Sequence, residues 1–347
     1  MRYVPIKLLK TGMTLGRDVY DGAGRMLLAT HLQLNEGYIK DLENLGFPGV
    51  YIDDEFSEGI EIREVIRPEV KREALGLISK VFMPDGEDNV SGQDIGRMVE
   101  NVVDNVLDNG DVMCNMLDIK NYDDYTYFHS VNVGILSAMV GIDMEMEREE
   151  LIELTTAGML HDIGKRFISV EILNSPGKLD DDQMKIMQEH SRKGADFLRD
   201  KYNFPSNVNQ GVLQHHEWYN GEGYPLGRYG EEIPMIARII SLIDVYDALT
   251  SNRPYRDALP NSEAVEYLMG NAGRQFDPKV VEAFLHKVAI YPEGSQVELS
   301  DGRRAIVVEN SPEVPLRPLL RDIDTKETID LTFDYNCRNV TITKIII

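Results

Sequence analysis

The sequence has few cysteines, no long apolar run and no obvious leader, and each of these scarcities excludes a class of protein. Its 347 residues contain two cysteines, Cys114 and Cys337, so a disulfide framework is not expected and a reducing compartment fits. No apolar stretch approaches the about 20 residues of a membrane span. The N-terminus lacks the long apolar stretch and the small-residue cleavage site of a signal peptide. These features predict a soluble, cytoplasmic protein with no membrane span.

Basic residues are also scarce. Asp and Glu number 59 against 36 Lys and Arg, which gives a formal net charge of −23. Binding to duplex nucleic acid requires a basic surface, so that function is not expected. A small anionic ligand remains compatible with this charge if metal ions or a few arginines supply local positive charge. With 42% hydrophobic residues the chain can form a sizeable core, which excludes a disordered protein.

The spacing of apolar residues divides the chain into four parts. The predicted parts are a small mixed α/β module over 1–64, a helical connector over 65–118, a helical domain over 119–289 and a small β module over 290–347. In the first part, short strands flank a glycine-rich turn within 19–28, and a helix over 34–45 precedes a strand over 49–52.

Apolar residues three and four positions apart predict helices in the central domain. These helices cover 127–140, 149–160, 181–198 and 233–249. Short β-branched runs follow at 297–299, 305–308, 329–333 and 340–346. Asp301-Gly302 lies between the first two runs and is typical of a hairpin turn.

Histidines are concentrated in the central helical domain. Five of the seven lie there, namely His129, His161, His190, His215 and His216. His161 is followed directly by Asp162, and two of the others are adjacent. Imidazole and carboxylate groups bind borderline divalent metals, and one carboxylate can bridge two ions. A single histidine on a helix is more often an ordinary core or surface residue, but this grouping indicates a metal site.

Asp244 is a further candidate ligand because it interrupts the apolar run 239–245. A buried carboxylate costs several kcal/mol unless it is paired or bound to a metal. The alternative is an exposed position on an amphipathic helix. His31 and His286 lie outside the motifs and are interpreted as structural or surface residues, and Trp218, the only tryptophan, as a packing residue.

Several short motifs occur in a characteristic order. They are HDIGK at 161–165, HHE at 215–217, GEGYP at 221–225 and DVYDALTSNRPYR at 244–256, with further matches at 125–133 and 189–194. Together they resemble the HD-GYP family of phosphodiesterases, a branch of the HD-domain metal phosphohydrolases. The resemblance covers about residues 119–288, roughly half of the chain.

The resemblance implies an all-α catalytic HD-type domain, flanked by the small modules, that hydrolyses cyclic di-GMP, a bacterial second messenger. By position it implies one metal held by His129, His161, Asp162 and Asp244, and a second held by His190, His215 and His216, with Asp162 bridging the two. Some relatives carry a Glu four residues before the first histidine and bind a third metal. Tyr125 occupies that place here, so two metals are expected, although Asp123 or Asp124 could reach a third.

Two cations would bind the phosphate oxygens and lower the pKa of a bridging water to near neutrality, so that a metal-bridging hydroxide attacks in line. Asp162 would support this step as the bridging ligand. Lys165, four residues after His161, is expected on the same helix face with its ammonium group directed at the phosphate or the leaving oxygen. The alternative for Lys165 is a solvated side chain at the end of a helical turn.

Four other residues are candidates for contacting the substrate or supporting a ligand. Arg253 and Arg256 follow Asp244 by nine and twelve residues and are expected to hold substrate phosphates, or else to pair with surface acids. Tyr224 lies in a tight glycine-containing loop and either contacts a guanine or phosphate or is buried in a plain turn. Asp247, one helical turn from Asp244, is expected to accept a hydrogen bond from a ligand histidine.

The predicted function is metal-dependent hydrolysis of cyclic di-GMP to linear pGpG, with GMP as the product of a second cut. Iron or manganese is expected, although the ligand set also suits zinc, nickel or cobalt. The alternatives are another cyclic dinucleotide such as cyclic GMP-AMP, general HD-type nucleotide hydrolysis, or a non-catalytic cyclic dinucleotide sensor. A homodimer formed through the helical stretch 75–117, and a regulatory partner at the N-terminal module, are further expectations.

Overall fold

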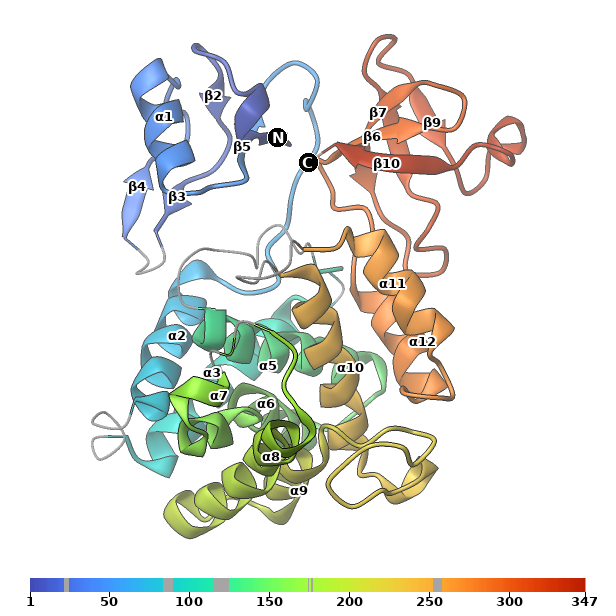
Figure 1. The fold of residues 1–347 in the computed structure, drawn as a ribbon. Helices are drawn as coiled ribbons and strands as arrows, with labels where there is room; N and C mark the ends of the chain where they lie inside the picture. The colour runs from blue at the N-terminus through green and yellow to red at the C-terminus, as the bar shows by residue number, and fades with distance from the viewer. Residues whose placement is uncertain are drawn as a thin grey trace. The chain divides into compact units, whose positions relative to one another are not determined.

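The computed structural model describes residues 1–21, 25–83, 90–110, 112–114, 125–173, 175, 177–251 and 258–346. They belong to two compact units (Figure 1). One unit comprises Met1–Glu64, Val112–Asp124 and Val288–Ile347, and the other comprises Val65–Asp111 and Tyr125–Lys287. Each unit is assembled from segments that are distant in the sequence. The bounds of the four predicted parts stay predictions.

The N-terminal part of the first unit contains a three-stranded antiparallel sheet with strand order β1-β5-β2. Its strands are β1 (Arg2–Pro5), β2 (Thr14–Leu15) and β5 (Gly49–Asp53). A separate hairpin is formed by β3 (Val19–Tyr20) and β4 (Met26–Leu28), and helix α1 (Glu36–Asn44) begins where Asn35 accepts the N–H of Tyr38. The predicted short strands within 19–28, the strand over 49–52 and the helix over 34–45 are confirmed, whereas the glycine-rich turn at 22–24 lies outside the described residues.

The C-terminal part of the same unit is a five-stranded antiparallel sheet with order β10-β6-β7-β8-β9. The strands are β6 (Gln296–Leu299), β7 (Arg304–Glu309), β8 (Leu319–Asp322), β9 (Thr328–Asp330) and β10 (Ile342–Ile346). The turn between β6 and β7 contains Gly302 with a φ of 87°, a conformation that glycine adopts without strain. The predicted β module and its Asp301-Gly302 hairpin are confirmed.

The second unit is helical. Its helices are α2 (Pro68–Phe82), α3 (Gly92–Asp108), α5 (Tyr125–Asp143), α6 (Arg148–Leu160), α7 (Val170–Leu173), α8 (Asp181–Tyr202), α9 (Ser206–Gln214), α10 (Met235–Thr250), α11 (Asn261–Gly270) and α12 (Pro278–Lys287), with a short 3-10 segment η3 (Ile163–Phe167). The all-α domain predicted between two small modules is therefore confirmed.

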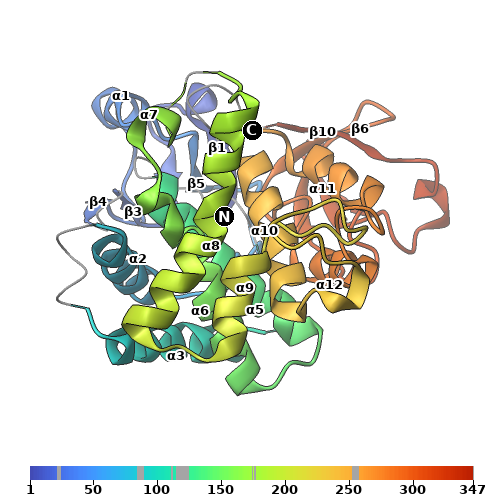
Figure 2. The same ribbon diagram turned by 60° about the horizontal axis from the view of Figure 1, so that its bottom comes forward.

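Four helices form the centre of this unit and carry most of the site. Helix α5 packs against α6 and α10, and α9 packs against α6, α8 and α10. Figures 1 and 2 show α5, α6, α9 and α10 side by side in both views. Helix α5 is buried almost all round between Ser130 and Val140, as expected of a helix with apolar residues on every face.

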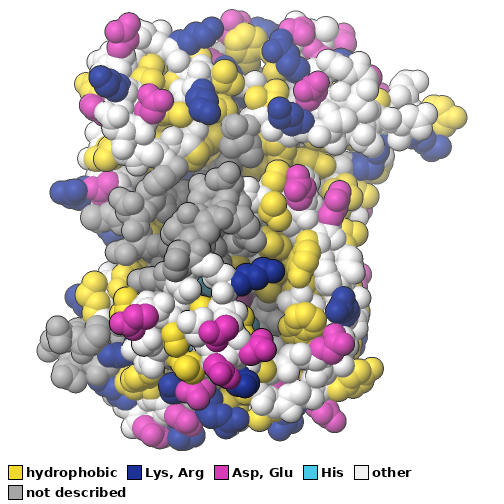
Figure 3. All heavy atoms as spheres, viewed as in Figure 1, with side chains coloured by type: hydrophobic (Ala, Val, Ile, Leu, Met, Phe, Trp, Pro, Cys, Tyr) yellow, Lys and Arg dark blue, Asp and Glu magenta, His cyan; other side chains and the backbone are white. Residues whose placement is uncertain are grey.

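Within the described residues, no helix combines the length and apolar character needed to cross a membrane. Acidic and basic side chains are interspersed over the helical part of the face drawn in Figure 3.

Candidate metal centre

The structure brings all seven predicted ligands together in the helical unit. His129 lies in α5, His190 in α8 and Asp244 in α10, whereas the other four directly follow the ends of α6 and α9. Those four are His161, Asp162, His215 and His216. Four of the five histidine side chains and Asp162 are at most 3% exposed. Ligands from five helices thus converge on one buried place.

The first group of ligands, here called cluster A, contains His129, His161, Asp162 and Asp244. The Nε2 atoms of His129 and His161 are 3.3 Å apart. Oδ1 of Asp244 is 3.2 Å from Nε2 of His129, and Oδ2 of Asp162 is 3.4 Å from Nε2 of His161. The donor atoms of His129, His161 and Asp162 lie within 4.8 Å of one another, a spacing that could hold one metal ion.

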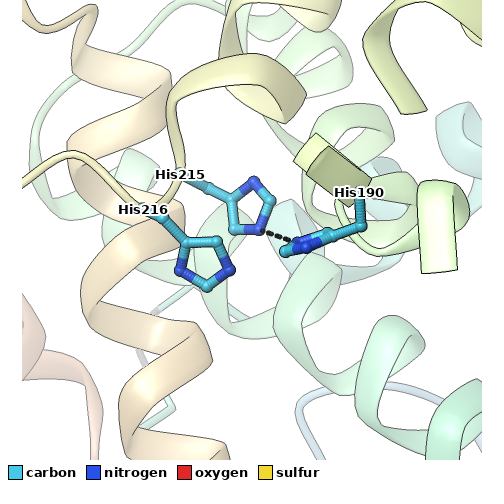
Figure 4. A group of neighbouring side chains, drawn as sticks. All are labelled: His190, His215 and His216. Atoms are coloured by element: carbon cyan, nitrogen blue, oxygen red, sulfur yellow. Dashed lines mark hydrogen bonds between the residues drawn. The ribbon is translucent and has the colours of Figure 1, made fainter. Parts of the chain in front are cut away.

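The second group, cluster B, contains His190, His215 and His216. Figure 4 shows the rings of His190 and His215 meeting at their Nε2 atoms, which are 3.4 Å apart, with the His216 ring beside them. The ring centroids of His215 and His216 are 4.1 Å apart. Donor atoms of the three residues also lie within 4.8 Å of one another.

Asp162 connects the two clusters through its two oxygens. Oδ2 faces His161 in cluster A, and Oδ1 is 3.5 Å from Nε2 of His190 in cluster B. One carboxylate therefore lies between two sets of imidazole nitrogens. This is the arrangement that a bridging ligand of two cations requires.

Hydrogen bonds at Nδ1 orient the imidazoles. Nδ1 of His161 donates to the carbonyl of Gly158, and Nδ1 of His190 donates to the carbonyl of Met187, both at 2.7 Å. Nδ1 of His215 donates to the carbonyl of Val212, also at 2.7 Å. A carbonyl oxygen can only accept, so each Nδ1 carries the proton and each Nε2 is directed into the site.

The electrostatics of cluster B suit a cation. Burial lowers the pKa of His190 and, together with the neighbouring histidines, lowers that of His215 well below its ordinary value. Burial also lowers the pKa of His216 to about 3. His190 and His215 are therefore neutral with their protons on Nδ1, so two Nε2 lone pairs face each other at 3.4 Å. A divalent cation that accepts both lone pairs would remove the repulsion between them, and the imidazole nitrogens of cluster B are suitable ligands for such an ion.

Cluster A concentrates negative charge. Burial alone would lower the pKa of His129, but the hydrogen bonds that its ring donates to Asp244 and Asp247 outweigh burial and raise the pKa to about 10. For the Asp162 carboxyl, burial would raise the pKa, but the nearby Lys165 and His161 hold this pKa well below its ordinary range. The carboxylates that attract a proton to His129 would equally attract a metal ion. The clustered histidines and aspartates thus indicate divalent metal binding.

Asp247 lies where the sequence suggested. Its Oδ2 accepts Nδ1 of His129 at 2.7 Å, and its Oδ1 accepts the side-chain N–H of Asn132 at 3.3 Å. Asp247 is 1% exposed. This carboxylate holds the His129 ring so that Nε2 is directed at cluster A.

The predicted helical position of Lys165 is wrong. Helix α6 ends at Leu160, and Lys165 lies in the 3-10 segment η3 rather than on one helix face with His161. The α-helix ends before Gly164. Gly164 packs so closely against α8 that a Cβ at this position would overlap the carbonyl oxygen of His190. The Lys165 ammonium nevertheless donates to Oδ2 of Asp162 at 2.5 Å, so it lies beside the centre.

Tyr224 lies in the loop that follows His216. Its ring centroid is 4.8 Å from that of His216, with an interplanar angle of 31°. Tyr224 is partly buried, and burial raises its pKa. The hydroxyl therefore stays protonated and available as a hydrogen-bond donor next to cluster B.

Some predicted residues lie outside the described part of the chain. These are Arg253, Arg256, Asp123 and Asp124, and the side chain of Tyr125. Their predicted roles are not tested by the structure.

His286 pairs with Asp143 through Nδ1 at 2.9 Å, away from the motifs. The ring of Trp218 lies under the guanidinium of Arg274, 5.8 Å from the ring centroid.

Sequence reasoning missed the roles of Asn132 and Glu217. Asn132 lies one turn after His129 and reaches Asp247, a residue 115 positions away in the chain. Glu217 is buried, and it accepts backbone N–H groups nine and eleven residues further on. The HHE motif contains Glu217, but a carboxylate next to two histidines gives no sign of whether it binds metal or backbone.

Comparisons with known proteins found similarity over the part of the chain that carries this centre. The HD domain family matches residues 112–280. A cyclic di-GMP phosphodiesterase of Pseudomonas aeruginosa is 37% identical over 224 residues, which cover 65% of this chain and 54% of that protein. A cyclic di-GMP phosphodiesterase response regulator of Xanthomonas campestris is 41% identical over 151 residues, covering 43% of this chain and 40% of that protein.

A third relative is a 3'3'-cGAMP-specific phosphodiesterase of Vibrio cholerae, 33% identical over 169 residues that cover 49% of this chain and 36% of that protein. The helical fold with its two histidine clusters and the match of residues 112–280 identify an HD-type domain. The similarity to cyclic di-GMP phosphodiesterases supports the resemblance to the HD-GYP family that the sequence motifs indicated. It spans about half the length, or less, of these curated relatives.

Proposed function

We propose that this chain hydrolyses cyclic di-GMP at a dinuclear metal centre formed by clusters A and B. The observation that carries the proposal is the bridging position of Asp162 between two sets of imidazole nitrogens, at 3.4 Å from His161 and 3.5 Å from His190. The similarity to two cyclic di-GMP phosphodiesterases supports the choice of substrate.

The side chains divide the work as follows. His129, His161 and Asp244, with Asp162, would hold one cation, and cluster B with Asp162 would hold the other. The cations, when bound, supply the positive charge that binds phosphate oxygens and lower the pKa of water at the site toward neutrality. Asp247 accepts a hydrogen bond from Nδ1 of His129, which keeps the proton on that nitrogen and fixes the orientation of the ring.

Lys165, beside Asp162, and Tyr224, beside His216, are proposed to contact the substrate. The Lys165 ammonium, 2.5 Å from Asp162, is placed to donate to a phosphate oxygen or the leaving oxygen. The Tyr224 hydroxyl or ring contacts a phosphate or guanine next to His216. We assign Arg253 and Arg256 to the substrate phosphates on their position in the motif alone.

The proposed metals are two iron or two manganese ions. The donors are imidazole nitrogens and carboxylate oxygens, a set that suits these metals and also zinc, nickel or cobalt. A third ion is not proposed, because Tyr125 takes the place at which some relatives carry a Glu.

The test is turnover of cyclic di-GMP by protein purified without oxygen, with its metals counted in the same sample. Linear pGpG or GMP together with about two metals per chain supports the proposal. If the protein holds two metals and binds cyclic di-GMP tightly but forms no product, the proposed hydrolysis is refuted. That result would favour a non-catalytic sensor.

A second cyclic dinucleotide is favoured by one observation, the similarity to a 3'3'-cGAMP-specific phosphodiesterase. Competition between cyclic di-GMP and 3'3'-cGAMP at equal concentration distinguishes the two substrates by the ratio of their kcat/KM values. Inclusion of mononucleotides in the panel tests general nucleotide hydrolysis.

We also propose a homodimer formed through residues 75–117 and a regulatory contact at the N-terminal module. Helices α2 and α3 pack against each other and present their outer faces to solvent. Sedimentation that shows a monomer at working concentration would refute the dimer.

A further inference from the structure

Glu217 is a buried carboxylate that directly follows His215 and His216 of cluster B. Its side chain is 2% exposed. Oε1 accepts the backbone N–H of Leu226 at 2.6 Å, and Oε2 accepts that of Arg228 at 3.0 Å. Two backbone donors thus compensate for burying the negative charge. The same bonds tie residues 226–228 to the chain segment that carries His215 and His216.

The loop 218–230 rests closely on that segment. Gly223 packs against the backbone at residues 216–218, and a Cβ there would overlap the amide nitrogen of Trp218. The N–H of Tyr224 donates to the carbonyl of His216 at 3.1 Å. The Tyr224 ring lies over the His216 imidazole, 4.8 Å between centroids. The position of Tyr224 therefore depends on how the whole loop is held.

We propose that Glu217 is a positioning residue, which holds the loop through the N–H groups of Leu226 and Arg228 and so places Tyr224 beside cluster B for contact with the substrate. The substrate contact of Tyr224 rests on the proposed function, whereas the holding of the loop does not. Glu217→Gln keeps the shape of the side chain. Its amide NH2 would face one of the two backbone N–H groups, so one hydrogen bond is lost and two donors oppose each other.

Trp218 makes the state of the loop measurable without any reaction. It is the only tryptophan in the chain and lies next to Glu217, at the start of the loop. In metal-free protein we expect Glu217→Gln to increase acrylamide quenching of Trp218 fluorescence by ~2-fold, because a loosened loop opens locally. The far-UV circular dichroism spectrum should stay unchanged.

The matched control is Glu231→Gln, directly after the loop. Glu231 is exposed. This variant should be quenched like the wild type. Equal quenching of Glu217→Gln and the wild type would overturn the proposal.

In metal-loaded protein we expect Glu217→Gln to raise KM by roughly tenfold while kcat and bound metal change little. In a Tyr224→Ala background the same substitution should add nothing, because Tyr224 is the group that Glu217 positions. Independent effects of the two substitutions would refute the positioning role.

The outcomes for the two proposals are distinguishable. A wild-type protein that turns over no cyclic dinucleotide contradicts the proposed function, while the quenching measurement still decides whether Glu217 holds the loop.

If Glu217→Gln is recovered unfolded, Gly223→Ala displaces the loop by a different route. Quenching of Trp218 that is unchanged in Gly223→Ala would count against the tightly held loop.

Discussion

Replacement of Asp247 by Asn tests whether this carboxylate sets the affinity of cluster A for metal. Asp247 is 1% exposed, and its Oδ2 accepts Nδ1 of His129 at 2.7 Å. The substitution keeps the shape but removes the negative charge from a charge-assisted hydrogen bond. Such a bond contributes about 1.5–3 kcal/mol. Since about 1.4 kcal/mol corresponds to a tenfold change in affinity, we expect metal binding to weaken roughly 10- to 100-fold.

The measurement is calorimetric titration of Mn²⁺ into chelator-treated protein, with bound metal counted by elemental analysis. The matched control is Asp182→Asn, because the Asp182 side chain is 90% exposed on α8. Circular dichroism would establish that Asp247→Asn is folded. An affinity of folded Asp247→Asn within about twofold of the wild type would refute the reasoning, because His129 would then not depend on this carboxylate for its orientation.

Three other variants separate metal binding from substrate binding. His161→Ala combined with Asp162→Ala should abolish turnover and reduce bound metal, because it removes ligands of both clusters; full activity would end the dinuclear account. Lys165→Ala should slow kcat by roughly 10- to 100-fold with metals retained, the effect of one lost charged hydrogen bond, and a normal kcat would leave Lys165 as a surface residue. Arg256→Ala should raise KM by about tenfold with unchanged metal content, and an unchanged KM would remove Arg256 from the substrate site.

Local features of the sequence predicted much of the fold. The three- and four-residue apolar spacing of 149–160 and 233–249 corresponds to α6 and α10. The Asp301-Gly302 turn corresponds to the β6–β7 hairpin. These predictions succeeded because helix periodicity and turn chemistry depend on residues close in the chain.

Short or weakly periodic elements were not predicted. Helix α9 has nine residues, and its stability depends on packing against α6, α8 and α10. The end of α6 before Lys165 was missed for a related reason. Gly164 approaches the backbone of His190, and that contact joins residues 26 positions apart.

The sequence by itself determined which donor groups are present: five histidines and two aspartates whose chemistry suits a divalent metal. Only the tertiary structure decided their arrangement. The contact of His129 with Asp247 joins residues 118 positions apart, and that of His190 with His215 joins residues 25 positions apart. The position of Asp162 between the two clusters follows from the packing of η3 against α8. The hydrogen bonds of Glu217 join it to backbone N–H groups nine and eleven residues further on. A side chain's chemistry belongs to its residue, whereas the direction of its donor atoms depends on neighbours that only the folded chain brings together.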